Sequence, residues 1–92
     1  MEQIIKNKDQ ITRACNINKV KTLFVTSPGV NDKLQADSDI DFIVDIDEKD
    51  PISYFDFYFN LKSDLEKLLN RRIELLERKV VKDSLLGEQI FE

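Results

Sequence analysis

The feature that most constrains this chain is the regular alternation of acidic and apolar residues over 39–47. One set of alternate positions is apolar: Ile40, Phe42, Val44 and Ile46. The other set is mainly acidic: Asp39, Asp41, Ile43, Asp45 and Asp47. Because successive side chains of a β-strand point to opposite faces, this pattern predicts a strand with one apolar face and one acidic face.

The acidic face calls for a positive counter-charge. Asp39 and Asp41 stand at i and i+2, so their side chains point the same way, about 6.5–7 Å apart along the strand. Like charges on one strand face repel and add nothing to stability. Divalent cations that prefer oxygen ligands bind carboxylates arranged in this way. A metal is therefore the leading candidate for the counter-charge.

Three other interpretations of the acidic run stay open from the residues alone. It is also typical of a solvated sheet edge, where charges oppose strand-to-strand aggregation. It partly matches an EF-hand calcium loop at Asp37, Asp39, Asp41 and Glu48. That loop needs glycine at its sixth position, where this chain has Phe42. A capping role for Asp37 or Ser38 would leave Asp41 unexplained.

The composition narrows the class of protein. The 92 residues are enough for one domain with a modest core, so we expect a single domain over 1–92. No apolar run reaches the roughly 18 residues of a membrane span, and the first residues do not resemble a signal peptide. Cys15 is the single cysteine, which fits a cytoplasmic protein without disulfides, and it is expected to be a small buried side chain.

Two further counts exclude other kinds of chemistry and partner. The chain has no histidine, which rules out His-ligated zinc sites and Ser-His catalysis. Its net charge of −4 argues against nucleic-acid binding and is compatible with a basic protein partner. We expect neither nucleic acid nor membrane as a partner.

The remaining chain alternates helical and strand patterns. Helices are predicted over 2–15 and 52–69, and strands over 20–26, 39–47 and 73–77. Residues 27–32 form a predicted turn that opens a short helix, with Ser27 as N-cap and Pro28 at its first position. Residues 80–92 are predicted to be a short final helix or a frayed tail. The order indicates an α/β fold, with helices packed on a small mixed sheet of at least three strands.

The helix predicted over 52–69 carries more aromatic surface than one buried face needs. Leu61 and Leu65 belong to its apolar stripe, whereas Phe55, Phe57 and Phe59 lie off that stripe. One interpretation is a helix pressed between the sheet and the N-terminal helix; the other is an interface with a partner.

The order of elements and the Ser38-Asp39-Ile40-Asp41-Phe42-Ile43-Val44 motif resemble the minimal nucleotidyltransferases of the polymerase β-like superfamily. The resemblance extends from Val20 to about Glu77. In bacteria, many of these proteins are the antitoxin of a pair whose toxin is a helical HEPN protein. The resemblance therefore implies a nucleotidyltransferase-like fold and, as partners, a nucleoside triphosphate and a HEPN-like toxin. It leaves a homo-oligomer open.

The activity implied by this resemblance is transfer of a nucleoside monophosphate from a nucleoside triphosphate, with ATP the expected substrate, to an acceptor hydroxyl. Two magnesium ions would assist, one at the attacking hydroxyl and one at the triphosphate and leaving pyrophosphate. Asp39 and Asp41 match the family's metal-binding pair. Glu74 matches the position of its third carboxylate, where glutamate reaches about 1 Å further than the usual aspartate. Glu74 as an ordinary exposed strand residue stays open.

The sequence departs from the family in the turn after the first strand. The family has a Gly-Ser pair there, which lets the backbone approach the phosphates and donate to them. Here those positions fall on Ser27 and Pro28, or on Thr26 and Ser27 if one residue is inserted. We therefore take Thr26, Ser27 and Ser38 as the candidate nucleotide-binding residues. Losing a preorganised donor to a phosphoryl group costs about 3–4 kcal/mol.

Three hypotheses follow. The first is a magnesium-dependent nucleotidyltransferase whose acceptor is a hydroxyl on a partner protein, such as a tyrosine of a HEPN-type toxin. The second is a catalytically degenerate antitoxin that keeps the fold and acts as an interaction module. The third is an acidic structural domain that binds no nucleotide.

Overall fold

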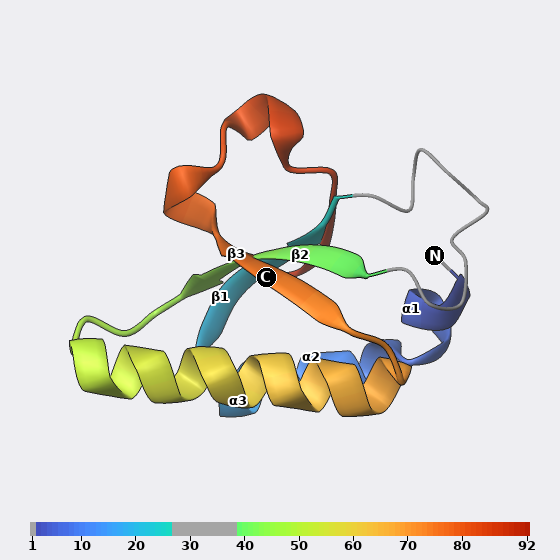
Figure 1. The fold of residues 1–92 in the computed structure, drawn as a ribbon, viewed down its shortest axis with the longest axis horizontal. Helices are drawn as coiled ribbons and strands as arrows, with labels where there is room; N and C mark the ends of the chain where they lie inside the picture. Colours follow the sequence, from blue (N-terminus) through green and yellow to red (C-terminus); the bar gives the residue numbers. More distant parts are fainter. Residues whose placement is uncertain (1, 27–38) are drawn as a thin grey trace.

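The computed structural model describes residues 2–26 and 39–92, in which a four-stranded sheet is covered by helices on one face (Figure 1). The elements follow one another as α1 (Glu2–Lys6), α2 (Lys8–Ile17), β1 (Val20–Val25), β2 (Ile40–Ile46), α3 (Pro51–Leu69), β3 (Ile73–Glu77), η1 (Arg78–Val80), η2 (Asp83–Leu85) and β4 (Glu88–Phe91). No helix among these residues is both long and apolar enough to cross a membrane.

The sheet is mixed, as predicted. Its strand order is β3-β2-β1-β4, so β1 and β2 are the inner strands. β2 runs antiparallel to β1 and parallel to β3, and α3 makes the crossover between the two parallel strands. β4 adds to the free edge of β1 in the antiparallel direction.

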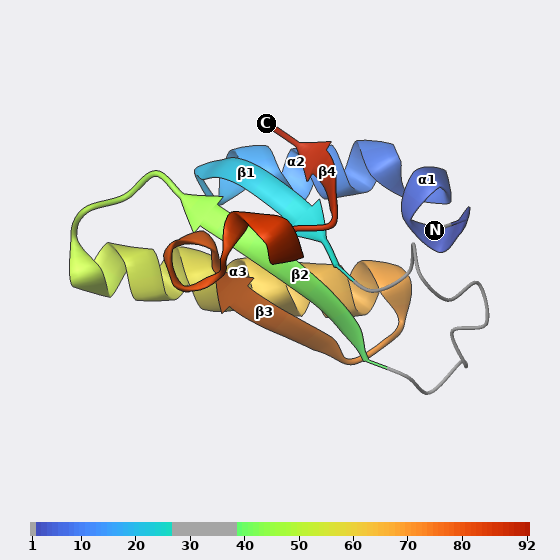
Figure 2. The same ribbon diagram turned by 90° about the horizontal axis from the view of Figure 1, so that it is seen from above.

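The alternation in β2 sorts its side chains as the sequence predicts. Four of them are at most 5% exposed and belong to the main core: Ile40, Phe42, Val44 and Ile46. Ile43 is also buried, at 1% exposed, but it lies on the other face and outside that core. The chain after β3 runs over that face, and η1 contacts β2, so Ile43 is shielded from above (Figure 2).

α3 begins and ends at well-defined caps. The Asp50 carboxylate accepts a hydrogen bond from the Ser53 backbone N–H at 3.0 Å, and Pro51 occupies the first turn. Asn70 ends the helix in the left-handed conformation, with φ 51°. Between these caps, Leu61, Leu65 and Leu69 are fully buried.

The two long helices lie side by side under the same face of the sheet (Figures 1 and 2). α3 is therefore not pressed between the sheet and the N-terminal helix, because α2 contacts both α3 and β1 directly. The buried Asn18 links α2 to α3 by hydrogen bonds. Its side-chain amide donates to the Ala14 carbonyl at 2.9 Å and to the Asp64 carboxylate at 3.3 Å.

Two boundaries differ from the sequence prediction. The helix expected over 2–15 is two helices that meet at Asn7, whose side-chain amide donates to the Gln3 carbonyl. The final helix or tail predicted over 80–92 is wrong: this segment forms two 3-10 turns and then strand β4. Local pattern did not reveal β4, because its pairing partner β1 lies more than 60 residues earlier and offers an otherwise free edge. The predicted turn and short helix over 27–32 fall outside the described residues.

Gly87 allows β4 to pair with the edge of β1. Its φ of +72° lies in the left-handed region, and a Cβ built there would sit 2.2 Å from the Val25 carbonyl oxygen. A side chain at this position would therefore clash with the backbone of β1 just before Thr26.

We predict that Gly87→Ala destabilises the protein by about 2 kcal/mol or more, because it adds left-handed strain to a backbone clash. Urea unfolding followed by circular dichroism measures the loss. The exposed Ser84→Ala, in the same segment, serves as control and should change stability by less than about 0.5 kcal/mol. Equal stability of the two variants would contradict this role of Gly87.

Candidate functional site

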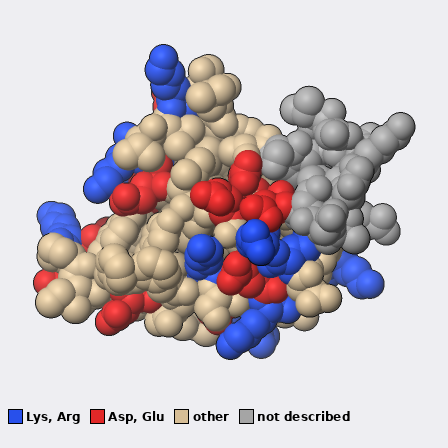
Figure 3. Space-filling model, in the orientation of Figure 1, with Lys and Arg blue, Asp and Glu red and all other residues tan. Residues whose placement is uncertain are grey.

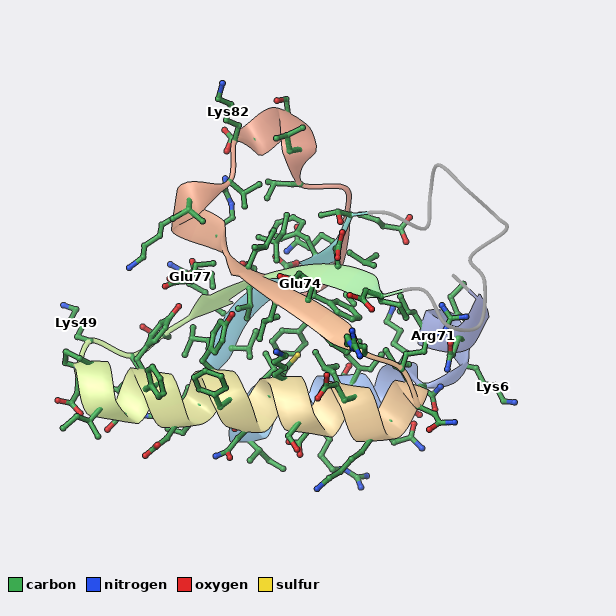
Figure 4. All side chains as sticks on the ribbon, viewed as in Figure 1. Lys6, Lys49, Arg71, Glu74, Glu77 and Lys82 are labelled. Atoms are coloured by element: carbon green, nitrogen blue, oxygen red, sulfur yellow. The ribbon has the colours of Figure 1, made fainter. Side chains whose placement is uncertain are left out.

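The pairing of β2 with β3 places two predicted site residues side by side. In the parallel register Asp41 is opposite Glu74. The neighbours of these two residues, Phe42 and Leu75, are buried in the core on the helix-covered face. Both carboxylates therefore project from the other face, and Figure 4 shows Glu74 midway along the sheet.

Asp39 is exposed and directly precedes β2. The backbone N–H of Ile40 donates to the Arg72 carbonyl at 3.1 Å, which extends the β2–β3 pairing to this point. Asp39, Asp41 and Glu74 thus gather near the amino ends of two parallel strands. Figure 3 shows acidic atoms grouped over this part of the sheet.

The electrostatics of Asp41 reflect this crowding. Burial raises the pKa of its carboxyl group, and the charges of Glu74 and Asp39 raise it further. A cation at this place would relieve the repulsion that these charges create.

The donor set suits magnesium without forming a complete cage. Within the described ranges, no three carboxylate or thiol side chains lie close enough to hold a metal ion by themselves. Magnesium is usually bound by one or two carboxylates, and phosphate oxygens and water complete its octahedron. Asp39 and Asp41 are the two carboxylates that could bind magnesium in this way, and Glu74 stands on the neighbouring strand opposite Asp41.

Thr26 is the one predicted nucleotide-binding residue that the structure describes. Its backbone N–H donates to the Asp41 carbonyl at 3.1 Å, and its hydroxyl donates to the same oxygen at 3.3 Å. The end of β1 therefore lies beside Asp41, and the Asp41 carbonyl accepts from both the backbone N–H and the hydroxyl of Thr26. Ser27 and Ser38, with the position of the missing Gly-Ser pair, lie outside the described residues.

Cys15 takes no part in this site. It is fully buried in the core, and burial raises the pKa of its thiol to about 12. At neutral pH the side chain is an uncharged thiol, as the sequence indicated.

A second feature, at the opposite end of the parallel strands, was not predicted from the sequence. A hollow of about 490 Å³ opens beside the carboxyl ends of β2 and β3. Its lining includes Asp45, Lys49, Tyr54, Phe55 and Glu77. Figure 4 shows Lys49 and Glu77 at this end, away from Glu74. The sequence signal that could have predicted this hollow is the set of charged residues directly after β2 and β3.

Two tyrosines join α3 to β3 next to this hollow. The Tyr54 hydroxyl donates to the Glu77 carboxylate at 2.6 Å, and the Tyr58 hydroxyl donates to the Leu75 carbonyl. Burial and the Glu77 carboxylate raise the pKa of Tyr54. Both hydroxyls are therefore protonated and held in place at neutral pH.

An aromatic patch borders the same hollow. We define it as Ile52, Phe55 and Phe59, which are 75%, 61% and 46% exposed and lie along one side of α3. The rings of Phe55 and Phe59 are 4.6 Å apart. Phe57, by contrast, packs against the core. Exposed apolar clusters of this kind typically mark interaction surfaces.

Comparison with known proteins gives a match of structure but none of sequence. No family model and no curated protein matches the chain. Two solved structures do: one is described as "the toxin-antitoxin with AMP-PNP", and the other is a mutant of the toxin-antitoxin MntA-HpeT with two aspartates replaced by glutamates. The TM-score is 0.64 in both cases, over 91% of this chain and 72% of theirs, at 19% and 18% identity.

The chain shares its fold with these toxin-antitoxin proteins. The predicted α/β fold, with helices packed on a small mixed sheet, is therefore confirmed.

We predict that Asp41→Asn stabilises the protein at pH 7. The raised pKa means that ionising Asp41 costs stability, and that cost grows as the pH rises above the ordinary aspartate value of about 3.9. Removing one of two like charges on paired strands is worth roughly 0.2–1 kcal/mol. Thermal unfolding should show a rise in Tm of roughly 1–8 °C at pH 7.

The gain should fade near pH 3, where Asp41 of the unmodified protein is itself protonated. Asp56→Asn, at an exposed position of α3, is the control and should leave Tm nearly unchanged at both pH values. A gain for Asp41→Asn that is equal at pH 3 and pH 7 would show that charge is not its cause.

Proposed function

We propose that this protein is a nucleotidyltransferase-fold member of a toxin-antitoxin pair, and that it transfers a nucleoside monophosphate to a hydroxyl on its partner. The observation that carries the proposal is the register that sets Asp41 beside Glu74, next to Asp39, on this fold. The substrate we propose is ATP, with magnesium.

The three carboxylates have distinct places in this proposal. Asp39 and Asp41 hold the metal, and Glu74 lies beside them as a third acceptor on the neighbouring strand. When bound, magnesium supplies positive charge that lowers the pKa of the acceptor hydroxyl and neutralises the triphosphate. Thr26 is fixed to the Asp41 carbonyl, so the end of β1 lies beside the strand that carries Asp41.

One of the structural neighbours was solved with AMP-PNP, an analogue of ATP, which supports a nucleotide as the ligand of this fold. Both neighbours are toxin-antitoxin proteins, which supports a toxin as the partner. We propose a HEPN-type toxin, with a tyrosine as acceptor.

We predict that incubation with α-labelled ATP, magnesium and the product of the neighbouring gene transfers label to that product. Asp39→Ala and Asp41→Ala should each reduce transfer at least roughly 100-fold, because metal stabilisation of phosphoryl charge is worth several kcal/mol. Transfer is measured by gel autoradiography and mass spectrometry of the product.

Asp47→Ala is the matched control, since Asp47 is an exposed carboxylate directly after β2 and is not among the residues that line the hollow. Its transfer rate should stay within about threefold of the unmodified protein. No transfer, or transfer that survives the loss of Asp39 and Asp41, would reject the enzymatic proposal.

A second function has its own support. The aromatic patch on α3 is exposed, and the sequence lacks the Gly-Ser pair that a working phosphate site would use. A protein with these features can neutralise a toxin by binding it, without any catalysis. Large aromatic side chains beside a hollow are frequent anchors of protein interfaces.

For this second function we predict that Phe55→Glu and Phe59→Glu each weaken toxin binding at least about tenfold, because both rings would anchor the partner. Titration calorimetry with the purified toxin measures the affinity, and a growth assay measures neutralisation. Ile17→Glu, which changes an equally exposed apolar residue on α2, should leave both unchanged. Neutralisation that depends on Asp39 but tolerates both phenylalanine changes would instead support the enzyme.

A further inference from the structure

A basic residue stands next to the carboxylates in the register of the sheet. β2 and β3 pair with Ile40 opposite Ile73, so Asp39 and Arg72 occupy the preceding positions of the two strands. The hydrogen bond from the Ile40 backbone N–H to the Arg72 carbonyl, at 3.1 Å, fixes this juxtaposition.

Arg72 is placed on the same face as the acidic residues. It stands two residues before Glu74, and Ile73 between them is buried in the core at 1% exposed. With a strand's alternation, Arg72 and Glu74 both project away from the helices. Basic atoms adjoin the acidic group in this region of the surface (Figure 3).

No ion pair among the described residues uses the guanidinium of Arg72. Arg72 is exposed, and the ion pairs among the described residues are Lys19–Glu48, Arg78–Asp83 and Lys79–Glu77. In the register of the sheet Arg72 therefore stands opposite Asp39 and two residues before Glu74, without an ion pair to either of them.

A nucleotide's triphosphate needs such a group here. Three carboxylates repel a triphosphate unless cations stand beside it, and the sequence lacks the Gly-Ser donors at Ser27 and Pro28. Arginine binds phosphate with two parallel hydrogen bonds and keeps its charge at any physiological pH.

We propose that Arg72 binds the triphosphate of the nucleotide beside Asp39, Asp41 and Glu74. Its guanidinium would replace part of the phosphate binding that the missing Gly-Ser pair supplies in the family. This inference rests on the proposed nucleotidyltransferase function. It assigns Arg72 to the phosphates and not to the metal. Loss of Arg72 should therefore weaken nucleotide binding without weakening metal binding.

The test uses the whole chain and three probes. Manganese without nucleotide, followed by electron paramagnetic resonance of the free ion, reports the carboxylate site alone. ATP with magnesium, followed by titration calorimetry, reports the complete site, and inorganic triphosphate with magnesium isolates the phosphate contact.

Arg72→Ala should lower the affinity for ATP and for inorganic triphosphate by at least about tenfold, because a charge-assisted contact is lost. The affinity for manganese alone should stay the same or rise, because a positive charge beside the carboxylates is gone. Arg72→Lys should recover part of the loss. Arg13→Ala removes an equal charge from α2, under the opposite face of the sheet, and should change neither affinity.

The outcomes separate this inference from the function on which it rests. If the unmodified protein binds no ATP with magnesium, both fall together. If ATP binds and Asp39→Ala weakens it, but Arg72→Ala stays within twofold, the inference alone is overturned. Equal losses of manganese and ATP affinity in Arg72→Ala would show a structural role and would also overturn it, as would a loss for ATP without one for triphosphate.

Discussion

The parallel pairing of β2 with β3 is the interaction on which the rest of this structure depends. It brings Asp41 and Glu74 together although they are 33 positions apart in the sequence. That juxtaposition is unfavourable by itself, since burial and neighbouring charges raise the pKa of Asp41. The apolar face of the same strand, with Phe42 and Val44 fully buried, supplies the stability that offsets it.

The helical layer and the C-terminal segment stabilise this arrangement from opposite faces. α2 and α3 cover the face of the sheet that forms the main core, and Leu61 and Leu65 of α3 are buried in that core. On the other face, the segment after β3 shields Ile43 and returns to pair with β1 as β4. Gly87 makes that return possible, next to the strand end from which Thr26 reaches the Asp41 carbonyl.

The two ends of the parallel strands differ in chemistry. The amino ends carry the carboxylates and Arg72, which suit a metal and a phosphate. The carboxyl ends carry the hollow and the aromatic patch, which suit a protein surface. One rigid pair of strands thus links both surfaces, so that a partner docked at α3 and a nucleotide held at Asp39 would keep a fixed spacing.

β2 with its two faces, helix α3 and the α/β class could be predicted from the sequence, because alternation and helical spacing are local signals. The sequence also located Asp39 and Asp41, whose common face follows from a period of two. The family resemblance suggested Glu74 as a third carboxylate, but the register that sets it opposite Asp41 came from the fold. The position of Arg72, strand β4 and the hollow beside Tyr54 also came from the fold. The physical reason is that strand pairing joins residues distant in the chain through backbone hydrogen bonds, which carry no signature in any single segment.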